Sequence, residues 1–283
     1  MAMHIGAHVS ISGKIYESLD RARALECNAM QIFSRNPRQW RQLELSAQDV
    51  EEFKKRRKTY KIEKVVVHIP YLINLASPYK VLYRKSIDAY IEDLKEADRL
   101  GAEFLVTHMG SHAKTVELAG IDRFASALNT IFDNTKGIKT RLLLENTSGS
   151  GSWLGYKFVH HRMIYNRVKQ VERLGACLDT AHAFAAGYDL KSETGLDSML
   201  SEIDELIGVD QIKVVHFNDS KKDFASRLDQ HDNIGKGKIG TAALQRIIRH
   251  AKLKDAVFIL ETPRIEQKDD LKNLKIAKKM IQK

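Results

Sequence analysis

The stretch SIDAYIEDLKEADRLGAEFLVTHM, residues 86–109, contains one complete helix-and-strand unit. Its first part repeats apolar residues at helical spacing, with Ile87 and Leu94 on one face, and Gly101 is suited to end the helix. The run FLVTHM that follows is short and almost continuously apolar, as expected of a parallel strand covered on both faces. A polar residue, His108, stands next to the end of this run.

Runs of this kind recur along the whole chain, and after the first interval their starts are 35 to 45 residues apart. Charged segments of helical period, such as FASALNTIFDNTKG (124–137) and TAALQRIIRHAKLK (241–254), lie between them. Eight strands alternating with helices predict an α/β fold, the (β/α)8 TIM barrel. A doubly wound open sheet is the structural alternative, but no glycine-rich dinucleotide fingerprint follows any strand. The eight runs are IGAHV (5–9), AMQIFS (29–34), KVVVHI (64–69), FLVTHM (104–109), RLLLENT (141–147), ACLDTA (176–181), IKVVHF (212–217) and VFILET (257–262).

The composition fits a single domain over residues 1–283, because 43% of the residues are hydrophobic and no Gly/Ser-rich or Pro-rich linker divides the chain. No apolar run approaches 18 residues, and the first ten residues do not form a targeting signal, so no membrane partner is expected. Cys27 and Cys177 are the only cysteines and form no CxxC motif. We therefore expect a soluble protein of the reducing cytoplasm.

The chain carries 46 Lys and Arg against 36 Asp and Glu, a formal net charge of +10. Such a surplus favours a polyanionic partner, although solubility alone would also account for it.

Almost every strand run ends in a side chain that can titrate or bind a metal ion. Parallel strands of a barrel bring their carboxyl ends to one mouth, where active sites of this fold are built. One strand-end histidine is usually a partnered core residue, but several such groups at one rim would repel each other or stay unpaired without cations. The seven strand-end residues are His8, His68, His108, Glu145, Asp179, His216 and Glu261.

Three more ligand-type residues follow in loops: His182 in DTAH, and Asp229 and His231 in DQH. Residues two apart in an extended loop point the same way, so the last two can bind one ion. Leaving out His8, the set holds five histidines and four carboxylates and no sulfur. Such ligands suit Zn²⁺, with Mn²⁺ or Fe²⁺ as possible substitutes, and nine of them suit two or three ions with open coordination positions.

The other histidines are expected outside the direct ligand set. We expect His8 to orient a ligand or a water molecule beside the ions. His160 and His161 lie in a basic segment of helical character, and we expect both, like His250, to be solvated.

Two loops at the predicted mouth carry residues that would suit a nucleic acid, if that is the polyanionic partner. The loop after the second strand supplies Arg35, Arg38, Trp40 and Arg41, and the loop after His68 supplies Tyr71 and Leu72. Apolar side chains of this kind can act as wedges in a kinked duplex, although Trp40 and Tyr71 could equally anchor their loops. Lys221, Lys222, Lys236 and Lys238 flank rim ligands and are better candidates for phosphate contacts than the basic stretches of the outer helices.

Taken together, the motifs resemble the endonuclease IV family of apurinic/apyrimidinic (AP) endonucleases, and the resemblance runs nearly from end to end. It implies a TIM barrel with three zinc ions. The matching motifs are GAHVS (6–10), NPRQW (36–40), VHIPYLINLASP (67–78), THMGSH (107–112), LLLENTSGSG (142–151), CLDTAHAFAAGYD (177–189), VHFNDSKKDFASRLDQHDNIGKGKIG (215–240) and LETP (260–263).

The resemblance also implies which residues serve which ion and which contact DNA. His68, His108 and Glu145 would hold one zinc. Glu145 would bridge to a second zinc, shared with Asp179, His216 and Glu261, and His182, Asp229 and His231 would hold the third. Glu145 and Glu261 would be the catalytic carboxylates, and Arg38, Tyr71 and Leu72 would penetrate the duplex at the lesion.

The implied reaction is hydrolysis of the phosphodiester 5′ to an abasic site in duplex DNA, by a monomer that flips the target nucleotide out of the stack. It leaves a 3′-hydroxyl and a 5′-deoxyribose phosphate.

Two other functions stay open at this point. A metal-dependent sugar isomerase or epimerase uses the same barrel and gathers similar ligands, but it normally has a lysine among its metal carboxylates, and no strand run here ends in one. A non-catalytic DNA-damage binder would meet phosphate with four carboxylates, which repel it unless metals are bound.

Overall fold

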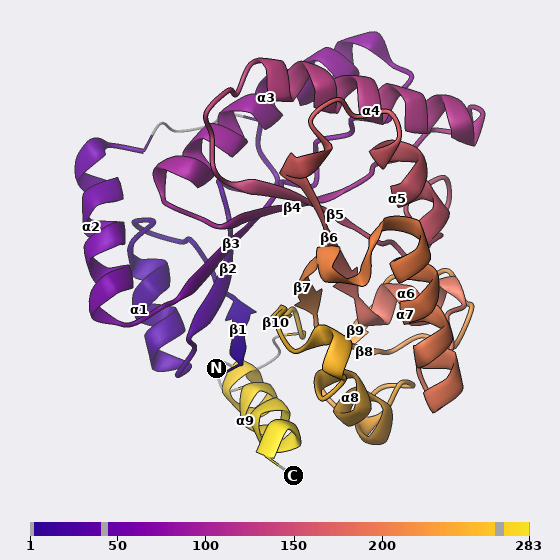
Figure 1. The fold of residues 1–283 in the computed structure, drawn as a ribbon. Helices are drawn as coiled ribbons and strands as arrows, with labels where there is room; N and C mark the ends of the chain where they lie inside the picture. Colours follow the sequence, from indigo (N-terminus) through magenta and orange to yellow (C-terminus); the bar gives the residue numbers. More distant parts are fainter. Residues whose placement is uncertain (1–2, 41–44, 264–268, 283) are drawn as a thin grey trace.

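The computed structural model describes residues 3–40, 45–263 and 269–282. Eight parallel strands form a closed barrel in the order β1-β10-β7-β6-β5-β4-β3-β2, and Figure 1 shows the helices around it. All eight predicted runs are barrel strands, so the TIM-barrel prediction is confirmed. The strands are β1 His4–His8, β2 Ala29–Phe33, β3 Lys64–His68, β4 Phe104–His108, β5 Arg141–Glu145, β6 Leu174–Asp179, β7 Ile212–His216 and β10 Val257–Leu260.

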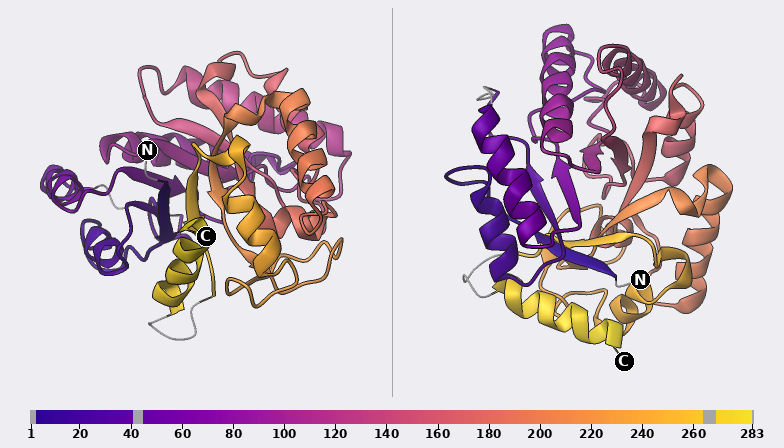
Figure 2. Two further views of the ribbon diagram at one scale, coloured as in Figure 1. Left: turned by 60° about the horizontal axis from the view of Figure 1, so that its bottom comes forward. Right: turned by 60° about the vertical axis from the view of Figure 1, so that its left-hand side comes forward.

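Helices follow the strands and pack on the outside of the barrel. Side-chain caps start three of them: α2 follows Ser46, whose hydroxyl accepts from the Asp49 N–H, α6 follows Asp179, and α7 follows Ser192. α9 lies beside β1 and closes the ring of helices (Figure 2). The helices are α1 Glu17–Ala24, α2 Ala47–Thr59, α3 Lys80–Arg99, α4 Glu117–Asp133, α5 Phe158–Tyr165, α6 Thr180–Ala186, α7 Glu193–Ile207, α8 Thr241–Ile248 and α9 Asp269–Gln282.

The barrel interior is filled by a compact layer of small and branched side chains, most of which are Val, Leu, Ile or Ala. A second, larger core lies between the strands and the helices. β1 and β2 approach so closely that a Cβ on Gly6 would lie 1.7 Å from the Ala29 carbonyl oxygen, so only glycine fits there. The interior layer consists of Ala29, Val66, Val106, Leu143, Cys177, Val214, Val257 and Ile259.

The segment between β7 and α8 contains a small hairpin that the strand pattern did not reveal. β8 (Asp219–Ser220) and β9 (His231–Asp232) pair antiparallel and return His231 to the barrel mouth. Among the described residues, no helix has the length and apolar character needed to cross a membrane.

Candidate metal centre

Each barrel strand contributes one polar side chain directly above the apolar interior layer. Because side chains alternate along a strand, the residue two positions after an interior residue points the same way. Val66 is thus followed by His68, Val106 by His108, and Leu143 by Glu145. The complete ring is His8, Gln31, His68, His108, Glu145, Asp179, His216 and Glu261.

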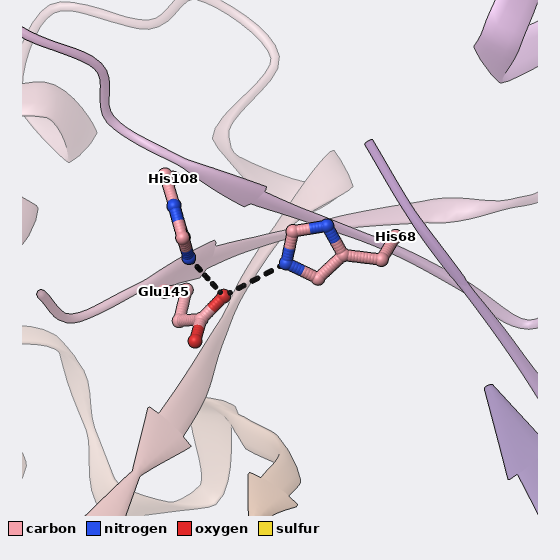
Figure 3. Close-up of side chains that lie close together, drawn as sticks. All are labelled: His68, His108 and Glu145. Carbon is pink, nitrogen blue, oxygen red and sulfur yellow. Dashed lines mark hydrogen bonds and ion pairs between the residues drawn. The ribbon is translucent and has the colours of Figure 1, made fainter. Parts of the chain in front are cut away.

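Glu145 is fully buried at the centre of this ring. Its Oε2 lies 3.2 Å from His68 Nε2 and 3.0 Å from His108 Nε2, and Figure 3 shows both rings directed at that oxygen. Its Oε1 lies 2.9 Å from His216 Nδ1 and 3.3 Å from His182 Nδ1. The two oxygens therefore face two different sets of imidazoles.

A second group of ligand atoms forms around Glu145 Oε1. His216 Nδ1 lies 3.3 Å from Glu261 Oε2 and 3.9 Å from Asp179 Oδ2. One ligand atom from each of Glu145, Asp179, His216 and Glu261 falls within 4.8 Å of the others, as one ion requires.

The third group involves the two loops. His182 Nε2 lies 3.1 Å from Asp229 Oδ1, and His231 Nε2 lies 3.7 Å from the same oxygen. His231 Nε2 is also 3.5 Å from Asp179 Oδ2, so Asp179 reaches both the second and the third group. The structure thus brings all nine predicted ligands to one mouth, in three groups.

Three of the site histidines are oriented by a hydrogen bond from Nδ1 to a backbone carbonyl. Nδ1 of His68 lies 2.8 Å from the Ile69 carbonyl, that of His182 2.9 Å from the Asn146 carbonyl, and that of His231 3.1 Å from the Glu261 carbonyl. A carbonyl oxygen only accepts, so these Nδ1 atoms donate, and in the neutral ring Nε2 keeps the lone pair. Metal-binding histidines are held in this way.

The charges at the site depend on each other. Burial alone would raise the pKa of Glu145, but His108 and His216 hold it well below its usual range. Burial would lower the pKa of His182, but Asp179 and Asp229 raise it well above its usual range. Burial would also raise the pKa of Asp229, but hydrogen bonding and charge from His182 bring it down to about 2. The carboxylates of Glu145 and Asp229 are therefore ionised and need positive charge beside them.

Divalent cations fit this arrangement of donors. Lone pairs on imidazole nitrogens and ionised carboxylates converge on the same points, which is unfavourable unless a proton or a metal ion lies between them. His231 Nε2 is buried and, within the described part of the chain, makes no hydrogen bond, so it is available as a ligand. The donors are nitrogen and oxygen only, a set suited to zinc and similar ions.

Sequence reasoning missed three amide side chains that hold the ligands. Asn218 Nδ2 donates to Asp179 Oδ2 (2.8 Å), and its Oδ1 accepts from the Glu261 N–H. The Asn146 amide exchanges hydrogen bonds with both backbone groups of Asp179. Gln31, the third of the five residues of β2, lies level with His8, the last residue of β1. Gln31 could have been found from the alternation of side chains along the strand, because it lies two positions after Ala29 of the interior layer.

The predicted wedge residue Tyr71 stands over the mouth. Its side chain is 61% exposed, and its ring centroid lies 5.3 Å from that of Phe33. It borders two cavities, of about 410 and 270 Å³, whose walls include Glu261, His108 and Asp229. Tyr71 therefore does not anchor its loop in the core. Leu72 beside it is half-buried, and Arg38 is exposed.

The loop that carries Lys236 and Lys238 is held by a buried carboxylate, Asp219. Its oxygens accept from the backbone N–H groups of Ser220, Gly237, Ile239 and Gly240. Both lysines are exposed, as is Lys221, whereas Lys222 is half-buried. Lys238 pairs with Asp223 at 3.2 Å.

Arg35 differs from the prediction that it is a rim cation. Its side chain is buried and forms a bidentate pair with Asp93 of α3, at 3.0 and 2.9 Å. It also donates to the Trp40 carbonyl and so shapes the loop. Trp40 packs against the core, with Lys85 Nζ 4.4 Å from its ring centre, so it anchors the loop. Arg41 lies outside the described residues.

The prediction that His160 and His161 are solvated is wrong. Both are buried in α5, because neighbouring elements offer partners: His160 Nε2 lies 3.2 Å from Glu117 Oε1, and His161 Nε2 donates to the Leu144 carbonyl. Burial lowers the pKa of His161 to about 3. His250 is partly exposed and pairs with Asp197.

Comparisons with known proteins agree with this geometry. Residues 19–282 match the model of the xylose isomerase-like TIM barrel family. The protein "Probable endonuclease 4" of Halothermothrix orenii is 44% identical over 94% of this chain and 96% of its own. The crystal structure of endonuclease IV from Thermus thermophilus superposes with a TM-score of 0.87 at 35% identity, covering 99% of both chains. A D-tagatose 3-epimerase-like protein shares the fold, with a TM-score of 0.76 at 21% identity, covering 99% of this chain and 97% of its own.

The barrel and its ring of imidazoles and carboxylates define a xylose isomerase-like TIM barrel with a candidate site for several metal ions. Within that class the sugar epimerases share only the fold, whereas the endonucleases match in sequence over nearly the whole chain. The chain belongs to the endonuclease IV family.

Proposed function

We propose that the chain is an AP endonuclease that hydrolyses the phosphodiester 5′ to an abasic site in duplex DNA and leaves a 3′-hydroxyl and a 5′-deoxyribose phosphate. The observation that carries the proposal is the position of Glu145, whose two oxygens face two groups of ligands. A carboxylate so placed can bridge two cations, an arrangement suited to phosphodiester hydrolysis. The family membership supports the same activity.

Three zinc ions fit the three ligand groups. His68, His108 and Glu145 would hold the first. The second would lie between Glu145, Asp179, His216 and Glu261. The third would be held by His182, Asp229 and His231, with Asp179 within reach. Mn²⁺ or Fe²⁺ could replace zinc, because the donors are imidazole and carboxylate.

Bound metal ions would supply Lewis acidity, which lowers the pKa of water to about 7 and offsets charge on the phosphate. The protein's own groups would orient the reactants. Glu145 is fixed from both sides by imidazoles and can hold the attacking water near the phosphorus. Glu261 lines the cavity of about 410 Å³, and its ionised carboxylate can accept a proton there. Burial would raise the pKa of Glu261, but His216 holds it well below its usual range.

The site lies within the barrel mouth, so a base-paired nucleotide must leave the stack to reach it, and a missing base makes this less costly. Tyr71 and Leu72 would then occupy the gap in the duplex, with Arg38 beside them. The exposed position of Tyr71 above the ligands supports this role. Lys221, Lys236 and Lys238 would contact phosphates without regard to sequence.

The whole chain, residues 1–283, would act as one domain and as a monomer, with duplex DNA containing abasic sites as its partner. We place it in the cytoplasm, where the buried thiols of Cys27 and Cys177 stay reduced.

Incision of a labelled duplex that contains one tetrahydrofuran abasic analogue tests this function. We expect a single cut on the 5′ side, with a product end that a DNA polymerase can extend. Dialysis against a chelator should abolish the cut, and added Zn²⁺ should restore it. Glu261→Gln should keep DNA binding and lose nearly all cleavage, and near-normal turnover would contradict the role given to Glu261.

The matched controls are the same duplex without the lesion and a ketohexose offered as an epimerase substrate. A zinc-loaded protein that epimerises the sugar and leaves the duplex intact would favour the sugar-epimerase alternative. None of the eight ring residues, all within the described part of the chain, is a lysine, which weighs against that alternative. Binding of the lesion without cleavage would favour the non-catalytic binder.

A further inference from the structure

One member of the ring at the barrel mouth, Gln31, is neither a metal ligand nor a charged group, yet it is completely buried. It lies on β2 between His8 of β1 and the ligands from β7 and β10. A buried amide has to satisfy its donors and acceptor, so its partners show what it does.

The contacts of Gln31 fix the orientation of its amide. One terminal atom lies 2.6 Å from Glu261 Oε1. An ionised carboxylate only accepts hydrogen bonds, so that atom is the amide nitrogen, Nε2. The same nitrogen lies 3.0 Å from His8 Nδ1, which accepts its second hydrogen. The remaining amide atom is the carbonyl oxygen, Oε1, and it lies 2.8 Å from His216 Nε2.

This orientation determines which nitrogen of His216 carries the proton. Because Gln31 Oε1 only accepts, His216 Nε2 must donate, so in the neutral ring that can bind a metal ion the lone pair is on Nδ1. Nδ1 is the nitrogen that faces Glu145 Oε1 at 2.9 Å and Glu261 Oε2 at 3.3 Å.

His216 is therefore oriented by a hydrogen bond from Nε2, whereas three other site histidines are oriented by one from Nδ1. His68, His182 and His231 are each fixed at Nδ1 by a backbone carbonyl, which leaves Nε2 as the ligand atom. In His216 the fixing group is a side chain, and the same side chain also holds Glu261. A single residue thus sets two of the four ligands of the second group.

We propose that Gln31 is a positioning residue for the second metal ion: it selects the tautomer of His216 that binds through Nδ1 and fixes the carboxylate of Glu261. This proposal rests on the proposed metal-dependent function. The hydrogen bonds of the Gln31 amide go to His8, His216 and Glu261, so the first and third ions, which these residues do not serve, should not depend on it.

The variant Gln31→Met keeps the length of the side chain and removes its hydrogen bonds. Thr140→Val is the matched control, since it removes a buried hydroxyl that donates to the Ala102 carbonyl, far from the mouth. Both metal-free proteins are first compared by thermal unfolding. Metal content is then measured by mass spectrometry after equilibration with a series of competing chelators.

We expect Gln31→Met to lose one ion at chelator concentrations where the wild type and Thr140→Val keep three. A group that orients a metal ligand typically contributes about 10–100-fold to metal affinity, and the loss should fall in that range. The other two ions should be retained with unchanged affinity. Retention of all three with wild-type affinity, or loss of all three together, would overturn the proposal.

A second measurement needs no variant. Long-range proton–nitrogen NMR of the histidine rings in the zinc-loaded wild type should show a proton on Nε2 of His216 and on Nδ1 of His68, His182 and His231. Metal bound through Nε2 of His216 would contradict the proposal even if Gln31→Met failed to fold. Neither readout involves incision, so a wild type that binds three ions but leaves abasic DNA intact would refute the proposed function alone.

Discussion

Replacement of Asp93 by alanine should destabilise the protein by about 3–5 kcal/mol, because it leaves the buried Arg35 guanidinium without its counter-ion. The two side chains are 0% and 5% exposed, and the pair is bidentate. Burial raises the pKa of Asp93 even though Arg35 opposes the change, so the desolvation cost of the pair is large. Ser34 donates to the same carboxylate at 2.8 Å and would lose its acceptor as well.

The same reasoning predicts that the destabilising effects of Arg35→Met and Asp93→Leu are not additive. In the double variant Arg35→Met, Asp93→Leu no charge is left buried, so it should be more stable than Asp93→Ala. Loss of the Arg35 contact to the Trp40 carbonyl should also loosen the loop that carries Arg38 and weaken binding to an abasic duplex. Metal content should stay unchanged, since neither residue contacts a ligand group.

The assay is urea unfolding of the metal-free proteins at one pH, with binding measured separately by fluorescence anisotropy. Lys95→Ala is a control on the same helix, because Lys95 is exposed and pairs with Glu92 at the surface. A loss of less than about 1 kcal/mol for Asp93→Ala, the range of a surface pair, would refute the reasoning. A double variant whose loss equals the sum of the losses of Arg35→Met and Asp93→Leu, each measured alone, would refute it too.

Three further predictions concern the mouth and the core. Burial lowers the pKa of His161 to about 3 in the folded protein, so between pH 7 and 5 this residue takes up a proton in the unfolded chain and not in the native state. The free energy of unfolding should therefore fall by about 2 kcal/mol over this pH range because of His161. In acid titrations of the unfolding of the metal-free protein, His161→Asn should abolish that contribution. Tyr71→Ala should weaken binding to an abasic duplex about ten- to a hundredfold, and binding to intact duplex much less, in a competition assay. Asp219→Ala leaves four backbone N–H groups without their acceptor and should cost about 3 kcal/mol in urea unfolding.

Each of these has an outcome that would count against it. An equal pH slope for His161→Asn and the wild type would mean that another group controls acid stability. Equal weakening on both duplexes would remove the wedge role of Tyr71. Unchanged stability of Asp219→Ala would mean that the 233–240 loop is held by other contacts, such as that of Asn273 with the Ile234 N–H.

The barrel and its ligand ring could be predicted because both follow from short-range patterns. An apolar run that ends in His68, His108 or Glu145 shows the strand and its polar end together. Gln31 escaped notice because glutamine is not a usual metal ligand and stands inside an apolar run. Its role depends on partners from β1, β7 and β10, which no local pattern places beside it.

Arg35, His160 and His161 were predicted to be exposed and are buried, and the cause is again a partner that lies far away in the sequence. Arg35 was expected at the surface because arginine is rarely buried, but Asp93, 58 residues further along, compensates its charge. His160 and His161 were expected to be solvated because their segment is basic, yet Glu117 of α4 and the Leu144 carbonyl of β5 supply partners inside the protein. Burial of a polar side chain is decided by tertiary partners, and a single sequence does not reveal them.

The central claim is that divalent ions occupy the ring of imidazoles and carboxylates and enable the cleavage. The most direct test counts the metal ions in purified protein by mass spectrometry and measures incision of the abasic duplex on the same sample, before and after chelation. We expect about three metal ions per chain, one for each ligand group. Incision should disappear when the ions are removed and return when Zn²⁺ is added. A folded, metal-free protein that cuts the lesion at the full rate would contradict the account.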